Sequence, residues 1–184
     1  MMVRLARVFG LIGASLTGFL LIGFWLPNTW SAESTVEIPV VPEAVFLLLN
    51  DLSRWEEWTP WGDIESEVTA PAFGINARRT WDDEQMGSGS VTITESRRPH
   101  LIRYHVEMEG NTQINGKLEL VTVTDGSLVT WQEDGDFGWN PLMGYVARGM
   151  AESQGEQLTA SLTRLKEIAT SSDSTAHERG SDPG

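Results

Sequence analysis

The chain opens with a long apolar run in which no charged residue occurs, from Val8 to Leu26. As a helix rising ~1.5 Å per residue, this run would extend about 28 Å, close to the roughly 30 Å of bilayer hydrocarbon. Arg4 and Arg7 precede the run, and Trp25 and Trp30 follow at its far end. Basic residues on one flank and tryptophans on the other are typical of a membrane segment.

Residues 1–30 are therefore predicted to be an uncleaved membrane anchor. A signal peptide is the alternative, but its apolar region is normally about 7–15 residues long, and bulky Trp30 stands where cleavage needs a small residue. A buried helix of a soluble domain would not explain the flanking residues.

The two arginines favour a cytoplasmic N-terminus, which would leave the rest of the chain outside the cytoplasm, in the periplasm if the source is a Gram-negative bacterium. Small residues spaced by four, Gly10, Ala14 and Gly18, would suit helix pairing but are also common in membrane helices.

The polar and apolar alternation changes after this run. Ser34 to Val40 alternates and predicts a strand. Apolar residues at helical spacing then predict a helix from Pro42 to about Asn50, followed by a short helical turn from Arg54 to Trp58. Further alternating segments bounded by turn residues predict strands over residues 64–70, 76–81, 90–95, 101–108, 114–124 and 128–133.

A last apolar stripe predicts a long C-terminal helix that ends near Ala169. The stripe consists of Ala151, Gln154, Leu158, Leu162, Leu165 and Ala169. Glycines at 144, 149 and 155 favour a break before about Ala151, and residues 170–184 lack apolar side chains and are predicted to be disordered. The order predicts an α+β domain over residues 31–169, in which the helix covers the apolar face of a curved antiparallel sheet. A strongly curved sheet would leave a pocket under that helix.

Three stretches carry a resemblance to a known superfamily: VEIPVVPEAVFLLLNDLSRWEEWTPW (36–61), GSGSVTITES (87–96) and LVTWQEDGD (128–136). Over about residues 35–169 the chain resembles the SRPBCC (START-like, polyketide cyclase/dehydrase-like) superfamily, and most closely its membrane-anchored bacterial branch. The resemblance implies a helix-grip fold. It also implies lipid, sterol, polyketide or quinone ligands, with catalysis in a minority of members. No catalytic motif is shared across the superfamily, so the catalytic residues stay unknown.

Strand parity and the helical stripe together give a set of predicted ligand-binding residues, because side chains in phase with the apolar positions should face the pocket. The set is Arg79, Trp81, Ile93, Glu95, Tyr104, Val106, Leu118, Trp131, Glu133 and Leu158. Tyr104 and Trp131 are expected to face inward, and Arg103 and His105 to face solvent.

The charged members of this set need partners if they are buried. Arg79 would pair with Glu133 or Glu95, or would bind the polar head of a ligand. The alternative is that these residues lie at strand ends, within reach of water. Trp55, Trp58 and Trp61 either line the pocket or close the end of the core.

Composition excludes several classes of function. A net charge of −13 repels phosphate backbones, so nucleic acid is not an expected partner. The chain has no cysteine, which excludes disulfides and thiolate chemistry. No histidine has ligand spacing for a metal, since His100 and His105 fall on opposite faces of one strand. We therefore expect no metal and no cofactor.

The leading hypothesis is a monomeric, membrane-tethered binding module for a hydrophobic small molecule such as a lipid, an isoprenoid or a quinone. One alternative is a cyclase, dehydratase or hydrolase in which Arg79, Glu95, Tyr104 and Glu133 supply acid–base groups. The other is a protein-interaction module without a ligand. The cavity discriminates among them: apolar space favours carriage, converging polar groups favour catalysis, and a filled interior favours interaction.

Overall fold

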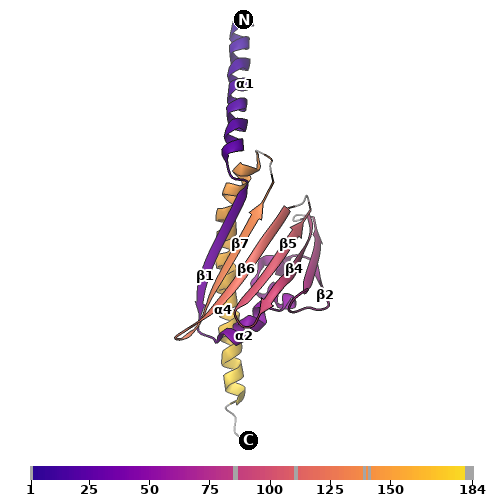
Figure 1. Cartoon of the computed structure of the whole chain (residues 1–184), viewed down its shortest axis with the longest axis vertical. Helices are drawn as coiled ribbons and strands as arrows, with labels where there is room; N and C mark the ends of the chain where they lie inside the picture. The colour runs from indigo at the N-terminus through magenta and orange to yellow at the C-terminus, as the bar shows by residue number, and fades with distance from the viewer. Residues whose placement is uncertain (1, 85–86, 110–111, 139, 141, 181–184) are drawn as a thin grey trace.

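The computed structural model describes the backbone of residues 2–84, 87–109, 112–138, 140 and 142–180. Side chains are described for residues 11–61, 64–84, 87–109, 112–138, 140 and 142–173. A seven-stranded antiparallel sheet packs one face against a long C-terminal helix, and the N-terminal helix projects from one end of the molecule (Figure 1).

The sheet has the strand order β1-β7-β6-β5-β4-β3-β2. Short helices follow β1 before the chain enters the rest of the sheet as an antiparallel meander. The elements are α1 (Met2–Trp25), β1 (Thr29–Ile38), α2 (Pro42–Leu49), η1 (Leu52–Arg54), α3 (Trp55–Trp58), η2 (Pro60–Asp63), β2 (Ser66–Thr69), β3 (Arg78–Asp83), β4 (Gly87–Arg97), β5 (Leu101–Met108), β6 (Thr112–Val123), β7 (Gly126–Asp136) and α4 (Met143–Gly180). The predicted α+β class and the predicted order of elements are confirmed.

The first strand begins at Thr29, before the predicted start at Ser34, because β1 pairs with β7 as far as Thr29 opposite Asp136. Trp30 is consequently a core residue, 4% exposed, and does not stand at the end of a membrane segment as predicted. Its ring lies over Gly135 on β7, where a Cβ would come within 2.5 Å of the indole nitrogen. The missing side chain at Gly135 makes room for the ring.

The C-terminal helix α4 lacks the predicted break before Ala151 and extends past its predicted end. It starts at Met143 without a break and contains 38 residues. Gly144 lies against the end of α1, since a Cβ there would be 2.6 Å from the Leu26 Cβ, so this glycine permits a close approach of the two segments. The backbone of α4 is helical to Gly180, past the predicted end near Ala169, and disorder of the tail stays a prediction. Residues 181–184 of the predicted tail lie outside the described residues.

Helix α1 extends away from the sheet, as Figure 1 shows. Its described side chains, from Leu11 on, are mostly exposed and apolar, and Trp25 is 90% exposed. The predicted membrane run starts at Val8, so its first residues lie outside the described side chains. Within the described part of the chain, no helix combines the length and the apolar character needed to cross a membrane.

Candidate functional site

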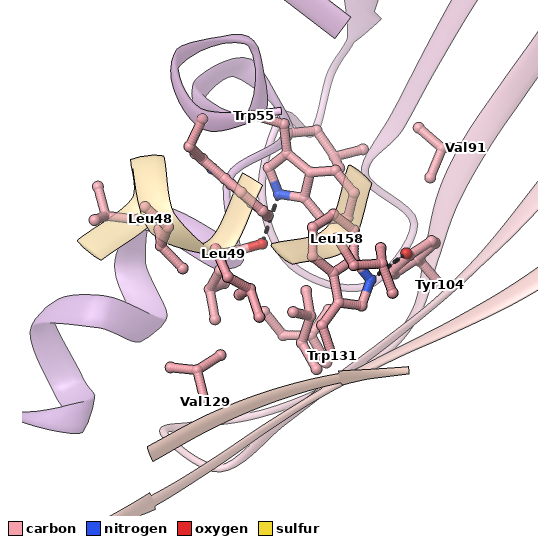
Figure 2. Close-up of a cluster of buried hydrophobic side chains, with 14 of the residues drawn as sticks. Leu48, Leu49, Trp55, Val91, Tyr104, Val129, Trp131 and Leu158 are labelled. Carbon is pink, nitrogen blue, oxygen red and sulfur yellow. Dashed lines mark hydrogen bonds between the residues drawn. The ribbon is translucent and has the colours of Figure 1, made fainter. Parts of the chain in front are cut away.

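A buried polar network joins the sheet to α4 in the middle of the domain. The Trp131 indole N–H on β7 donates to the Tyr104 hydroxyl on β5 over 2.7 Å (Figure 2). The Tyr104 hydroxyl donates in turn to Glu133 Oε1. Gln154 on α4 donates from Nε2 to Glu133 Oε2 over 2.6 Å. The network therefore fixes the position of α4 on the sheet through a hydrogen bond as well as through apolar packing.

Glu133 is the one carboxyl group among the buried residues of the described chain. Burial raises the pKa of Glu133, against the opposing effect of the hydrogen bonds from Tyr104 and Gln154. Burial and the Glu133 charge together raise the pKa of the Tyr104 phenol well above its usual range. The Gln154 amide suits either form of Glu133, because its NH2 donates to a carboxylate and its rotated carbonyl accepts from a carboxylic acid. Tyr104 and Glu133 are both buried, so neither group is open to solvent.

Aromatic rings occupy the space beside this network. Trp55, fully buried on α3, lies edge-on to Tyr104 with 5.1 Å between ring centroids. Its indole nitrogen donates to the Leu49 carbonyl over 2.8 Å (Figure 2). Trp58 lies 5.4 Å from Trp131 between ring centroids. These tryptophans are packed into the interior, so the space between sheet and helix is occupied by side chains of the domain itself.

Inward-facing glycines explain how so many rings fit. A Cβ at Gly116 on β6 would be 1.8 Å from Tyr104 Cζ, which means that the phenol ring lies flat on the bare backbone. Gly89 has the same relation to Trp81, with a Cβ 2.4 Å from Trp81 Cζ2. Together with Gly135 beneath Trp30, these pairs place three rings on the sheet at positions where a strand lacks a side chain.

Arg79 is buried, but its partner differs from the predicted one. Its guanidinium lies 3.2 Å from a Glu56 carboxylate oxygen on α3, and it also donates to the Leu52 carbonyl over 3.2 Å. Glu56 is 57% exposed in its side chain, so solvent reaches one end of this pair. Neither Glu133 nor Glu95 pairs with Arg79. Alternation along strands gave no information about Glu56, because the fold, and not the sequence spacing, brings α3 beside β3.

Glu95 faces outward, contrary to the prediction. The register between β4 and β5 shifts between Ile93 and Glu95, which places Glu95 opposite Arg103. Glu95 and the exposed Arg103 form an ion pair of 3.1 Å on the outer side. One extra residue in β4 between Ile93 and Glu95 reverses strand parity beyond it. Alternation therefore gives the correct face as far as Ile93 and the wrong face at Glu95.

The other predicted ligand-binding residues are buried in one core cluster with Tyr104 and Trp131. They are Trp81, Ile93, Val106, Leu118 and Leu158. The predicted orientations on β5 are confirmed, since Tyr104 is buried, Arg103 is exposed, and His105 contacts Asn115 in an exposed hydrogen bond. Whether any of these residues contacts a ligand stays a prediction. In five surface pockets of the described chain, Trp81 is the only predicted residue among those that form the walls.

An apolar groove of about 440 Å³ lies at the junction of α1, β1 and α4. Its walls are Leu26, Pro27, Thr29, Trp30, Ser31, Gly144, Ala147, Arg148 and Ala151. The sequence analysis missed it because three separate segments form it. The signal for it was the run of small residues on one face of α4, Gly144, Ala147 and Ala151, which leaves space beside β1. Elsewhere in the described residues, no cluster of histidine and acidic side chains is arranged to hold a metal ion.

Fold and network together define an α+β domain in which a curved antiparallel sheet holds a long C-terminal helix. The profile of the family described as "Polyketide cyclase / dehydrase and lipid transport" matches residues 29–170. The chain therefore belongs to this family, in agreement with the superfamily resemblance seen in the sequence. The matched range also supports a domain that starts at β1.

Solved structures agree on the fold at low sequence identity. A protein of unknown function from Staphylococcus aureus has a TM-score of 0.62 at 11% identity, covering 79% of this chain and 96% of its own. A hypothetical protein from Helicobacter pylori has a TM-score of 0.59 at 13% identity, covering 78% and 89%. DynU16, a protein of the dynemicin biosynthetic locus, has a TM-score of 0.54 at 11% identity, covering 74% of this chain and 46% of its own. No curated protein matches the chain.

Proposed function

We propose that this protein is a membrane-attached binding module for a hydrophobic small molecule of the acyl or isoprenoid class, and that the groove beside α1 receives that molecule. The groove is the observation that carries the proposal. Its volume of about 440 Å³ lies within the range of roughly 300–1,000 Å³ that is usual for small-molecule sites, and most of its walls are apolar. The family description includes lipid transport, which supports the same class of ligand.

The position of the groove supports a ligand that comes from a bilayer. Leu26 and Pro27, at the end of α1, form one wall, and Ala147 and Ala151 of α4 contribute to another. A hydrophobic molecule that leaves the lipid along α1 would meet this groove first. Arg148, exposed at the rim, would meet an anionic head group in water while the apolar tail lies in the groove.

The exposed apolar surface of α1 supports attachment to a membrane. Leu11, Ile12, Leu16, Leu21, Ile22 and Phe24 are each more than half exposed on this helix. A contiguous apolar surface of this kind normally has a partner, and lipid is the partner that accepts apolar side chains all around a helix. We propose that the domain lies outside the cytoplasm, on the basis of Arg4 and Arg7.

Native mass spectrometry of the full chain, released from lipid nanodiscs, tests the binding proposal. We expect a co-purifying lipid-like adduct on the wild type and its loss in Ala151→Phe, because a ring there fills the groove. Ala160→Phe is the matched control, since Ala160 is an exposed position on the same helix. Equal adduct in both variants, or none on the wild type, would refute the groove as a binding site.

Membrane attachment has a separate test. Replacing Leu16 and Leu20 together by arginine should move the full chain from the membrane fraction into the alkaline-extractable fraction, because two charges in lipid are unfavourable by several kcal/mol. Retention of this variant in the membrane would contradict the proposal.

The packed interior favours one second candidate, a protein-interaction module without a ligand. Trp55, Trp58 and Trp131 are buried and packed against one another, so they occupy the space that an internal ligand would need. The same mass spectra distinguish the two candidates, because an interaction module would carry no adduct in any variant.

A further inference from the structure

The connection from β7 into α4 is uncharged and exposes apolar side chains. In an acidic chain, no charged residue occurs between Asp136 and Arg148. Two large apolar side chains of this segment stand in the open: Leu142 is 46% exposed and Val146 is 48% exposed. They lie one helical turn apart at the start of α4, so they form one small apolar surface.

This segment is fixed beside α1. The rings of Phe19 on α1 and Tyr145 on α4 are stacked, with 4.4 Å between centroids and 6° between planes. The Tyr145 hydroxyl also donates to the Phe19 carbonyl over 2.8 Å. Behind this contact, the Phe137 N–H donates to the Asn28 carbonyl over 3.1 Å. Figure 1 shows the start of α4 beside the end of α1.

The contact sets the depth of the segment relative to α1. Phe19 precedes the last residue of α1, Trp25, by six positions, which corresponds to about 9 Å along a helix. The Tyr145 ring therefore reaches beside the apolar part of α1, whereas the α4 backbone at Gly144 lies against Leu26, directly after the last residue of α1. The first turn of α4 thus stands at the level of the end of α1, where a membrane that holds α1 would have its interface.

We propose that the first turn of α4 is a second membrane-contacting element, with Leu142 and Val146 inserted in the interfacial layer of the bilayer beside α1. This inference rests on the proposed attachment of α1 to a membrane. Lipid fits the segment because it accepts the two apolar side chains and requires no charged partner. Arg148, one turn further along α4 and exposed, then stands at the level of the lipid head groups.

Because the chain has no cysteine, a single introduced cysteine can be spin-labelled without first removing native ones. Single variants of the full chain, Leu142→Cys, Leu16→Cys and Val121→Cys, are labelled and reconstituted in vesicles of phosphatidylcholine and phosphatidylglycerol. For each variant, the rate at which the spin label collides with molecular oxygen, which concentrates in lipid, is compared with the rate at which it collides with a water-soluble nickel chelate. Val121 is the matched aqueous control, because it is exposed near the β6–β7 hairpin at the end of the sheet far from α1.

We expect the ratio of oxygen collision to chelate collision at Leu142→Cys to be several-fold higher than at Val121→Cys and lower than at Leu16→Cys, which lies further along α1. If Leu16→Cys reports lipid while Leu142→Cys matches Val121→Cys, the second contact is refuted and the attachment of α1 stands. If Leu16→Cys also reports water, the attachment itself is refuted, and the inference falls with it. A Leu142→Cys label protected from both reagents would indicate burial against protein, such as a second copy of the chain, and would also overturn the proposal.

Discussion

Leu158 near the middle of α4 and Leu142 directly before its first residue lie about four helical turns apart, and their surroundings are opposite. Leu158 is buried against the aromatic interior (Figure 2), whereas Leu142 is 46% exposed beside α1. In the sheet-facing part of α4 the domain covers its own apolar side chains with rings. At the first turn it leaves such side chains open. The difference shows that α4 is covered by the domain near its middle and leaves apolar side chains open at its start.

A leucine-to-alanine substitution at each of the two positions tests that difference and gives the largest expected effect. Leu158→Ala should lower the free energy of unfolding by about 2–5 kcal/mol, because it leaves a cavity in a packed core. Leu142→Ala should change it by less than about 0.5 kcal/mol, since the exposed side chain gives little to the folded domain. Urea unfolding of the full chain in detergent micelles measures both. Comparable losses in the two variants would mean that Leu142 belongs to the core.

Gly116→Ala tests whether rings on bare backbone hold the interior together. The new Cβ would stand 1.8 Å from Tyr104 Cζ, so the ring must leave its place, and overpacking of this kind typically destabilises by about 1–3 kcal/mol. Gly149→Ala is the control on exposed α4, with no atom within 4 Å of the new Cβ. It should stabilise the helix by up to about 1 kcal/mol. Thermal unfolding of both variants gives the comparison, and an unchanged melting temperature for Gly116→Ala would contradict the packing described.

Tyr104→Phe removes one hydroxyl from the buried network and keeps the ring. The Trp131 N–H and Glu133 then lose a partner away from water, which should lower the free energy of unfolding by about 1–3 kcal/mol. Tyr145→Phe, the matched change beside α1, removes a single exposed hydrogen bond and should have a smaller effect. Denaturant titration of the two variants decides whether the polar network or the ring packing holds Tyr104.

The pH dependence of stability should be small but specific to Glu133. Burial raises the folded-state pKa of Glu133 above the ordinary glutamate value. Between these two pKa values, the unfolded chain has released a proton that the folded chain retains, so stability falls as pH rises through that window. Below the ordinary value, both states are protonated and the full contribution is present.

Glu133→Gln should lack this decline and keep contacts to Tyr104 and Gln154. Melting temperatures of the wild type and the variant across mildly acidic pH provide the measurement. A parallel decline in both would assign the effect to other groups.

Much of the fold could be predicted because its patterns are local. The alternation from Leu101 to Met108 fixed which side chains of β5 enter the core, since a slip of one residue would have buried charges. The same rule placed Tyr104, Trp131 and Glu133 inside. It failed at Glu95, where a register shift reverses parity. Trp30 was misplaced by a different rule, the preference of tryptophan for membrane interfaces, and it packs on a glycine about a hundred residues away.

The arrangement of the site was less accessible from sequence, because its partners come from distant segments. Gln154 was assigned to the apolar stripe of α4, but its hydrogen bond to Glu133 depends on the angle at which α4 crosses the sheet. Glu56 and Arg79 meet only when α3 folds over β3. The groove needs α1, β1 and α4 together, and no single stretch of sequence contains it.

The three pairs of a glycine with an aromatic ring also bear on how an interior of this shape can gain or lose space for a guest molecule. Each pair, such as Gly116 with Tyr104, exchanges side-chain volume between facing positions while the backbone stays in place. Replacing the aromatic residue of such a pair by one with a short side chain, while the glycine is kept, would open a void under α4. The void would have about the volume of one aromatic side chain, and the strand register would not change. Chains of this architecture can therefore differ in whether they enclose a guest through substitutions at a few facing positions, and a closed interior in one chain can be one substitution away from an open one.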